Sequence, residues 1–326
     1  MQTRALLLEE NGEPENLSLV EMDLPEPGDT QVLVEMKAAG VSYVDVLMVA
    51  GQYQFKPDLP FVPGQEGAGI VKAIGNRVSN VTVGDHVITS HRTGAFAEHA
   101  VLDAGRVTAM PDKVDFVGAA SFRSNYATAL LAMQRANLKA GEVLLVHGAA
   151  GGVGLATVQI GKMMGATVIA TASRDDKLNV VKQQGADHTI NYSNGFRDQV
   201  KALTEGKGAD VIFDPVGGDV FDESMRCINY RGRIVIIGFT SGRAALAKTN
   251  HLLIKDATVI GMTVGSFTAH EPDAAAENAS QILGWVADGT LKPYVSHTFP
   301  LERAAEAMQV IKDRLVVGKV VVTMNS

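Results

Sequence analysis

The stretch from Val143 to Lys177 reads VLLVHGAAGGVGLATVQIGKMMGATVIATASRDDK. An apolar β-branched run leads into a glycine-rich turn and a helical pattern, and a second apolar run ends at Ser173. Short continuous apolar runs are typical of parallel strands that are covered on both faces. Glycines between such a strand and a helix let the backbone approach a pyrophosphate, and the helix end offers it unpaired N–H groups. This order of elements predicts a dinucleotide site in a doubly wound α/β domain, rather than a plain tight turn.

The end of the second apolar run indicates which dinucleotide is bound. NAD sites place Asp or Glu about 20 residues after the glycines, where the carboxylate binds the ribose 2′-hydroxyl. This chain has Ser173 and Arg174 there, with Lys177 one helical turn later. Guanidinium and ammonium groups suit the 2′-phosphate of NADP(H), which is therefore the expected cofactor. The alternative is that the two cations lie on a solvated face, and that Asp175 and Asp176 only begin a helix.

The composition predicts a globular protein and speaks against several classes of partner. With 326 residues, 46% hydrophobic and 20% charged, the chain is long enough for two domains with cores. A net charge of −7 speaks against a nucleic-acid binder, which needs clustered Lys and Arg. We expect no membrane span, since no apolar run approaches about 20 residues, and no secretion signal in MQTRALLLEENG. The single cysteine, Cys227, favours a reducing, cytoplasmic location.

The distribution of apolar runs and turn residues along the chain predicts two domains. Residues 1–122 are short apolar stretches separated by Gly, Pro, Asn and Asp, which is typical of a β-rich domain. Residues 123–266 alternate strands with helices. Residues 267–326 end in a strand that has no sheet of its own nearby, so we assign them to the first domain, which becomes discontinuous. The expected strands are Val143–His147, Thr167–Thr171, Val211–Asp214 and Arg233–Gly238, and the expected helices are Val153–Met164, Asp176–Gln184, Phe196–Leu203 and Ala274–Ala287.

Almost the whole chain resembles one protein family. The stretches that carry the resemblance are AAGVSYVDVLMVAGQY, PFVPGQEGAGIV, GDHVI, SNYATALLAM, GAAGGVG, GADHTINYS, DPVGGDVF, GRIVIIGF and GKVVV. They are similar to the zinc-free quinone oxidoreductase branch of the medium-chain dehydrogenase/reductase superfamily, the zeta-crystallin-like proteins. The resemblance implies a GroES-like catalytic domain at 1–122 and 267–326, a Rossmann domain at 123–266, and a cofactor cleft between them.

The resemblance also implies which residues hold the cofactor. At the pyrophosphate and the 2′-phosphate it places Ala150, Gly151, Gly152, Val153, Gly154, Ser173, Arg174, Lys177 and Tyr192. At the nicotinamide end it places Ser42, Thr128, Phe239, Gly318 and Lys319, and Val216 is a further cofactor contact. Family members often have Asn at the position of Ser42. For Tyr192 the alternative is a buried aromatic side chain at a strand end.

No catalytic metal is expected. Zinc-dependent relatives would need a Cys near Ser42, a His at Gln65 and a second Cys near Ala120, and this chain has none of these ligands. Without a Lewis acid, hydride transfer favours acceptors that are already electron-poor, such as quinones or carbonyl-conjugated alkenes.

Candidate hydrogen-bond donors to such an acceptor come from family position. Tyr53 is the first candidate, followed by Tyr43 and Asn125. A tyrosine hydroxyl would stabilise the charge that develops on the acceptor oxygen. The alternative is that Tyr53 only shapes the pocket.

These observations predict an NADPH-dependent oxidoreductase that reduces quinones or other conjugated carbonyls, with a small molecule as its partner. One alternative is an enone or enoyl-thioester (alkene) reductase, and another is a non-enzymatic NADPH-binding, RNA-binding or structural crystallin-like protein. Family members pair the last strand of the Rossmann sheet across a two-fold axis, so a homodimer through Ala257–Val264 is expected. The physiological acceptor, and whether one or two electrons are transferred, stay open at this point.

Overall fold

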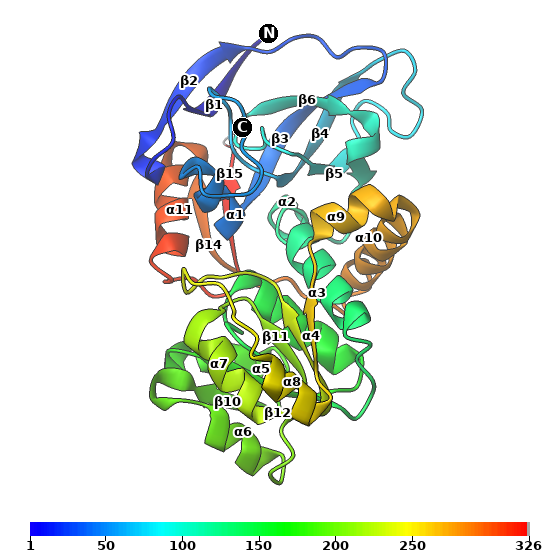
Figure 1. The fold of residues 1–326 in the computed structure, drawn as a ribbon. Helices are drawn as coiled ribbons and strands as arrows, with labels where there is room; N and C mark the ends of the chain where they lie inside the picture. The colour runs from blue at the N-terminus through cyan, green and yellow to red at the C-terminus, as the bar shows by residue number, and fades with distance from the viewer. Residues whose placement is uncertain (325–326) are drawn as a thin grey trace. The chain divides into compact units, whose positions relative to one another are not determined.

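The computed structural model describes residues 1–324, which divide into two compact units. The first unit comprises Met1–Arg123 and the chain from Val286 onward, and the second comprises Ser124–Trp285 (Figure 1). The second unit is continuous in sequence, whereas the first is built from both ends of the chain.

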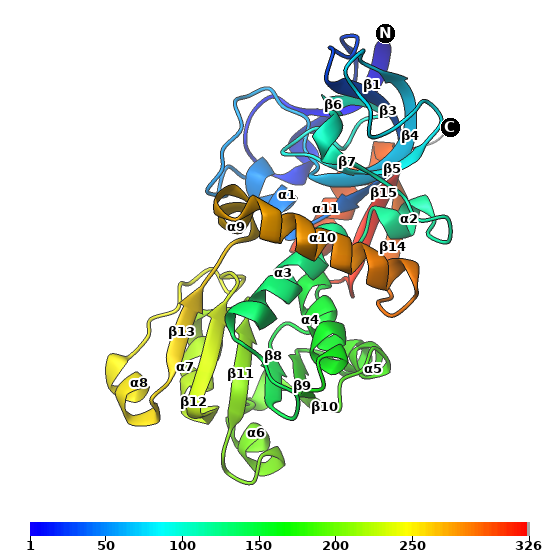
Figure 2. The same cartoon turned by 90° about the vertical axis from the view of Figure 1, so that its right-hand side faces the viewer.

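The second unit contains a six-stranded sheet in which every neighbouring pair is parallel. Its strands, in sheet order, are β10 (His188–Asn191), β9 (Thr167–Ala172), β8 (Val143–Val146), β11 (Ala209–Asp214), β12 (Ile228–Ile236) and β13 (Thr258–Gly261) (Figure 2). From β8 the chain moves outward to β9 and β10, then crosses to β11 and moves outward in the other direction. Ligands of such sheets bind outside the carboxyl ends of the strands where the order reverses. Here that point lies between β8 and β11, and the predicted doubly wound α/β domain is confirmed.

The helices of the second unit are α3 (Arg123–Arg135), α4 (Gly152–Met163), α5 (Asp175–Gln183), α6 (Arg197–Leu203), α7 (Gly218–Cys227), α8 (Thr249–Lys255), α9 (Val264–His270) and α10 (Pro272–Ala287). Helices α4 to α8 connect these strands, α3 precedes β8, and α9 and α10 follow β13. Gly165 and Gly185 follow α4 and α5 with φ of +82° and +114°, conformations that favour glycine and end a helix there. Among residues 1–324, no helix is long and apolar enough to cross a membrane.

Helix α10 belongs to the second unit for most of its length. The sequence analysis expected the chain to return to the first domain at residue 267, whereas the units divide between Trp285 and Val286. Asn278 of α10 and Gln134 of α3 exchange two side-chain hydrogen bonds, both 2.8 Å long. These bonds join α10 to α3, which accounts for its grouping with the second unit.

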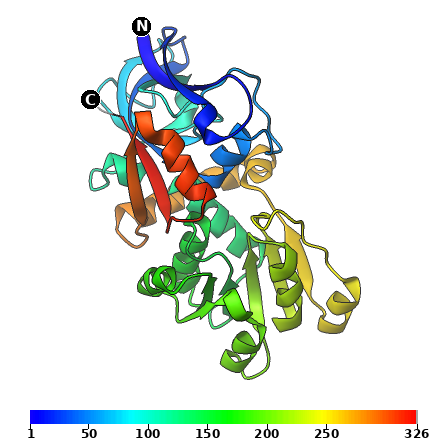
Figure 3. The ribbon, with the colours of Figure 1, turned by 90° about the vertical axis from the view of Figure 1, so that its left-hand side faces the viewer.

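The first unit contains a seven-stranded sheet and a two-stranded sheet. The larger sheet has the order β14 (Val295–Pro300), β15 (Lys319–Thr323), β3 (Gln31–Val41), β4 (Glu66–Ile74), β5 (His86–Ser90) and β7 (Val107–Ala109), with β6 (His99–Asp103) beside β3; the smaller pairs β1 (Gln2–Leu8) with β2 (Leu17–Asp23). Its helices are α1 (Tyr43–Val49), α2 (Phe116–Ala119) and α11 (Ala304–Lys312). Figure 3 shows α11 beside the C-terminal strands, in orange and red. The antiparallel pairing of β15 with β3 confirms that the last strand joins the first unit's sheet.

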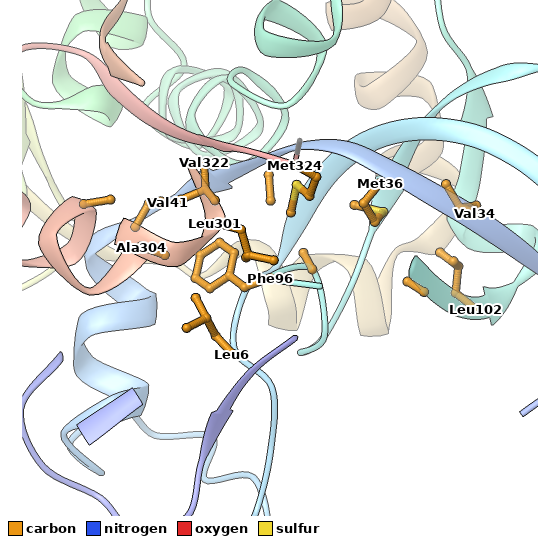
Figure 4. Packing of buried hydrophobic residues seen from close by; sticks show 14 of the residues in the cluster. Leu6, Val34, Met36, Val41, Phe96, Leu102, Leu301, Ala304, Val322 and Met324 are labelled. Atoms are coloured by element: carbon orange, nitrogen blue, oxygen red, sulfur yellow. The ribbon is translucent and has the colours of Figure 1, made fainter. Parts of the chain in front are cut away.

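The core of the first unit is formed by residues from both ends of the chain (Figure 4). Phe96 and Met36 come from the N-terminal part, and Leu301 and Val322 come from the C-terminal part; each is at most 1% exposed. Burying large apolar side chains is the main favourable term in folding. The first unit therefore needs both segments of the chain to complete its core.

Candidate functional site

The glycine-rich loop leads from β8 into α4 at the point where the strand order reverses. Gly148 has φ of +56°, and Gly151 begins the helix as its N-cap without any side-chain cap. The first N–H groups of a helix have no partner within the helix. They carry a partial positive charge, so this end of α4 is suited to the pyrophosphate of a dinucleotide.

Two glycines of this loop leave no room for a side chain. A Cβ on Gly154 would lie 2.3 Å from the carbonyl oxygen of Gly148, so the first turn of α4 packs directly on the loop. A Cβ on Gly152 would lie 2.5 Å from Nδ2 of Asn125. The sequence analysis proposed Asn125 as a donor to the acceptor, and the structure places its amide against the start of α4.

The residues proposed for the 2′-phosphate lie at the carboxyl ends of β9 and β10. Ala172 pairs with Asn191 in the parallel ladder, so the residues that follow, Ser173 and Tyr192, are neighbours. The Ser193 hydroxyl donates to the Ser173 carbonyl at 3.3 Å, which joins the two strand ends.

Two cations lie at the start of α5, next to these strand ends. Arg174 is the N-cap of α5 and is exposed, whereas Lys177 is only 7% exposed. The Arg174 guanidinium donates to both carboxylate oxygens of Asp176, at 3.0 Å and 2.7 Å. The structure therefore places Ser173, Arg174 and Tyr192 at neighbouring strand ends, with Lys177 in the first turn of α5.

On the other side of the reversal point, the loops after β11 and β12 are joined by backbone hydrogen bonds. Ser241 N donates to Val216 O at 3.0 Å, and a Cβ on Gly217 would lie 3.0 Å from the Phe239 ring. Val216 and Phe239, both proposed cofactor contacts, thus lie close together. Thr128 lies on α3, where its hydroxyl donates to the Ser124 carbonyl at 2.8 Å.

Asp214 closes the turn after β11. Its Oδ1 accepts hydrogen bonds from the backbone N–H groups of Val216, at 2.8 Å, and Gly217, at 2.9 Å. Its Oδ2 is buried and has no partner among residues 1–324. Burial raises the pKa of this carboxyl, against the lowering effect of the two N–H donors.

A buried histidine at the end of β8 joins three elements beneath the glycine loop. His147 Nδ1 lies 3.0 Å from the Thr171 hydroxyl of β9, and Nε2 lies 2.8 Å from the Ser224 hydroxyl of α7. Because Ser224 donates its proton to the Val220 carbonyl, its oxygen accepts from His147 Nε2–H. Nδ1 then accepts from Thr171. Burial lowers the pKa of His147 to about 3, so the ring is neutral at pH 7.

In the first unit, the start of α1 carries the remaining candidates. The Asp45 carboxylate Oδ2 accepts from both the backbone N–H and the hydroxyl of Ser42, each at 2.8 Å. Burial raises the pKa of Asp45 to about 6, although the Ser42 hydrogen bonds act in the opposite direction. Tyr43 is 40% exposed, and Tyr53 packs against the core. Burial, and then the charge of Asp45, raise the pKa of Tyr53, so its phenol stays protonated at pH 7.

The C-terminal strand brings a lysine into the same unit. Lys319 Nζ lies 2.5 Å from Glu66 Oε1, and both side chains are at most 5% exposed. The preceding Gly318 has φ of +67°, and a Cβ there would lie 2.2 Å from the Tyr294 carbonyl. The pair lies against Gly40, where a Cβ would meet both side chains. Lys319, a proposed cofactor contact, is thus a partner of Glu66 in this structure.

The positions where zinc-dependent relatives would hold the metal carry no zinc ligand. The Ser42 hydroxyl is bonded to Asp45, and Ala120 is a fully buried alanine whose carbonyl faces Gly40. Within the described chain, 1–324, no group of three or more His, Cys, Asp or Glu side chains is arranged to hold a metal ion.

Comparison with known proteins assigns the family. The chain matches the family model Alcohol dehydrogenase GroES-like domain over residues 28–112, and the model Zinc-binding dehydrogenase over residues 152–281. It is 39% identical over 300 residues to "Quinone oxidoreductase-like protein 2 homolog" of Nematostella vectensis, covering 90% of this chain and 82% of that protein. The chain belongs to the quinone oxidoreductase branch of the medium-chain dehydrogenase/reductase superfamily.

Solved structures agree with this assignment. The Escherichia coli quinone oxidoreductase complexed with NADPH has a TM-score of 0.90 and 28% identity, over 99% of this chain and 100% of that one. The CurF ER cyclopropanase of the curacin A biosynthetic pathway also has a TM-score of 0.90 and 28% identity, over 100% of both chains. The predicted fold class, a GroES-like domain plus a Rossmann domain, is confirmed, and the chain is an oxidoreductase.

Several contacts were not predicted from the sequence, although Lys319 itself was proposed as a cofactor contact. The polar contacts of His147 and the Glu66–Lys319 pair join residues that are far apart in the chain, and the Asp214 oxygen that lacks a partner is recognised only from its burial. A partial signal existed, since a histidine directly after four apolar strand residues must find buried partners.

We predict that Thr171→Val destabilises the second unit by about 1–3 kcal/mol, because Nδ1 of His147 is left buried without a donor. The matched control is Thr157→Val, since Thr157 is also fully buried but donates only to a carbonyl within its own helix. Denaturant unfolding measures both variants. An equal decrease in the free energy of unfolding in the two variants would contradict the role assigned to the His147 hydrogen bonds.

Proposed function

We propose that the protein is a zinc-independent oxidoreductase that transfers hydride from NADPH to quinones or other electron-poor conjugated carbonyls. The observation that carries this proposal is the uncapped α4 N-terminus next to Ser173, Arg174, Lys177 and Tyr192. A pyrophosphate fits the first feature, and a 2′-phosphate fits the second. The NADPH complex of the Escherichia coli relative supports this choice of cofactor.

Each part of the second unit has a defined task in this proposal. Bound NADPH supplies the hydride. The loop Ala150–Gly154 holds the pyrophosphate, Phe239 contacts the nicotinamide end, and Val216 is a further cofactor contact. The buried His147 holds β8, β9 and α7 together, so the loop keeps its conformation when the cofactor binds.

The first unit supplies the hydrogen-bond donors. Tyr53, whose raised pKa keeps the phenol protonated, donates a hydrogen bond to the acceptor oxygen as negative charge develops there, and Tyr43 is a second donor. Neutral donors stabilise a delocalised hydroquinone or enolate anion, but they are poor at ionising an alcohol. The proposed acceptors are therefore conjugated carbonyls rather than simple ketones.

An alkene reductase is the second candidate function. The CurF ER cyclopropanase shares the fold over the full chain, so this fold carries more than one reaction. In enones and enoyl thioesters, hydride adds to a carbon conjugated with the carbonyl, and the same donors bind that carbonyl oxygen. Comparing quinones with enones as substrates distinguishes the two functions.

We also infer a cytoplasmic homodimer. The only cysteine, Cys227, is buried and has no second cysteine with which to form an internal disulfide, which suits a reducing compartment. Strand β13 lies at the edge of its sheet. Just before it, Leu253 and Ile254 of α8 are 83% and 75% exposed. An open edge beside exposed apolar side chains favours pairing with a second copy.

The cofactor prediction is that NADPH binds at least about ten times more tightly than NADH, since a charge-assisted hydrogen bond contributes about 1.5–3 kcal/mol. Arg174→Ala should lower the ratio of the NADH Kd to the NADPH Kd. The matched control is Arg197→Ala, which removes an arginine that pairs with its neighbour Asp198 on α6. Fluorescence titration measures the affinities, and equal affinity of the wild type for both cofactors would refute the choice of NADP(H).

The reaction prediction is that NADPH reduces an electron-poor quinone or enone, that simple alcohols with NADP⁺ give almost no turnover, and that chelators change nothing. Tyr53→Phe should lower kcat by about 10- to 1000-fold, the range for loss of an oxyanion donor, with the NADPH Kd unchanged. Tyr230→Phe, at a 64% exposed position in the other unit, is the control. An unchanged kcat in Tyr53→Phe would show that Tyr53 only shapes the pocket. Rapid oxidation of simple alcohols by the wild type would refute the reaction class.

The assembly prediction is that the wild type sediments as a dimer at micromolar concentration, and that Val259→Pro in β13 yields monomers. Because proline also weakens a strand, Ile254→Lys on α8 provides a second test with less effect on folding. Leu203→Lys on α6, at a 43% exposed position, controls for the added charge. A monomeric wild type, or a dimer unaffected by both seam variants, would contradict this interface.

A further inference from the structure

The cation proposed to recognise the 2′-phosphate already has an anionic partner. Arg174 donates through Nε and Nη2 to the two oxygens of Asp176, at 3.0 Å and 2.7 Å. These two parallel bonds are the fork geometry with which a guanidinium recognises a phosphate. Asp176 occupies the Nε–Nη2 edge of the guanidinium. A 2′-phosphate must therefore either displace Asp176 from this edge or bind through Nη1 and Nη2 beside a cation that Asp176 already partly neutralises.

The position of the pair makes this competition relevant to cofactor choice. The Arg174 and Asp176 side chains are 53% and 61% exposed, whereas Lys177 is 7% exposed. Of the two cations at the start of α5, Arg174 is thus the one that solvent and a ligand reach directly. Asp176 lies in the first turn of α5, where the partial positive charge of the helix end favours a carboxylate.

We propose that Asp176 is a specificity-determining residue: it competes with the 2′-phosphate for Arg174 and lowers the preference for NADPH over NADH. NADH has no 2′-phosphate, so the Arg174–Asp176 pair stays intact when it binds. NADPH either displaces Asp176 from Arg174 or binds beside the intact pair, and in both cases its phosphate comes close to the Asp176 carboxylate, which adds repulsion between like charges. This inference rests on the proposed function, because it requires the 2′-phosphate of NADP(H) to bind at the start of α5.

Asp175 provides a matched control for Asp176. It lies in the same first turn and carries the same charge, but its Oδ1 accepts a hydrogen bond from the Asn191 side chain at 2.8 Å. An asparagine at position 175 keeps an oxygen for this bond. Asp175→Asn therefore reports the general effect of removing one negative charge from the start of α5, and Asp176→Asn adds the release of Arg174.

The experiment is calorimetric titration of the full chain and both variants with NADPH and NADH, at low and at high salt. An exposed ion pair contributes modestly, so Asp176→Asn should bind NADPH about two- to five-fold more tightly than the wild type. The gain should exceed that of Asp175→Asn, should be absent for NADH, and should shrink at high salt because charges in solvent are screened. The unchanged NADH affinity also shows that the variant is folded.

Other results overturn the proposal. Equal NADPH gains in the two variants would assign the effect to net charge alone, and weaker NADPH binding in Asp176→Asn would show that Asp176 orients Arg174 for the phosphate. NADPH binding by the wild type with no gain in Asp176→Asn overturns this inference alone. No NADPH binding by the wild type overturns the proposed function and this inference together.

Discussion

The close approach between the loop after β8 and the first turn of α4 is the constraint on which the second unit depends. With the Gly148 carbonyl 2.3 Å from where a Cβ of Gly154 would be, only a hydrogen atom fits between them. The contact directs the unpaired N–H groups of α4 to the carboxyl edge of the sheet. The polar contacts of His147 then hold this loop to β9 and α7, so rigid packing and a binding site for anions arise from the same few residues.

The first unit meets a different physical problem, since it holds charges away from water. The Glu66–Lys319 pair is almost fully buried, and Asp45 is buried with one oxygen lacking a partner among the described residues. Removing charges from water is unfavourable, and their mutual attraction offsets this only when the geometry is good. Here β3, β4 and β15 fix that geometry, because Gly40 lets both side chains approach its backbone. The interior near α1 is thus polar and positioned without any zinc ligand at Ser42, Gln65 or Ala120.

The features that could be predicted from the sequence are those written in neighbouring residues. Apolar runs, and the glycines that end helices, predicted the ends of β8, β9, β11, α4 and α5 to within two residues. The motif at Ser173–Lys177 grouped residues that lie together after β9. Helices α8 and α9 are only seven residues long and bury no residue fully, so they are too short to show a helical period in the sequence. The pattern of α10 indicated a helix but not its partner, which is why the domain boundary differs.

The side-chain contacts of the site could not be predicted for a related reason. Periodicity tells which face of an element is buried, but not which distant residue meets it. Asn125 lies against Gly152, and Lys319 against Glu66, only because the fold brings their elements together. Arg174 and Asp176 are two residues apart, yet the sequence analysis weighed only phosphate binding against a solvated face and did not predict their pairing.

The pairing of β15 with β3 also has a consequence for biosynthesis on the ribosome. Residues 38–41 of β3 pair with residues 320–323, so this edge of the strand stays open until residues 320–323 have been made. The second unit, continuous from Ser124 to Trp285, has all of its residues available earlier. Domains generally fold as units during synthesis. The second unit can therefore complete its sheet first, while one edge of β3, which pairs with β4 on its other side, stays open in the first unit.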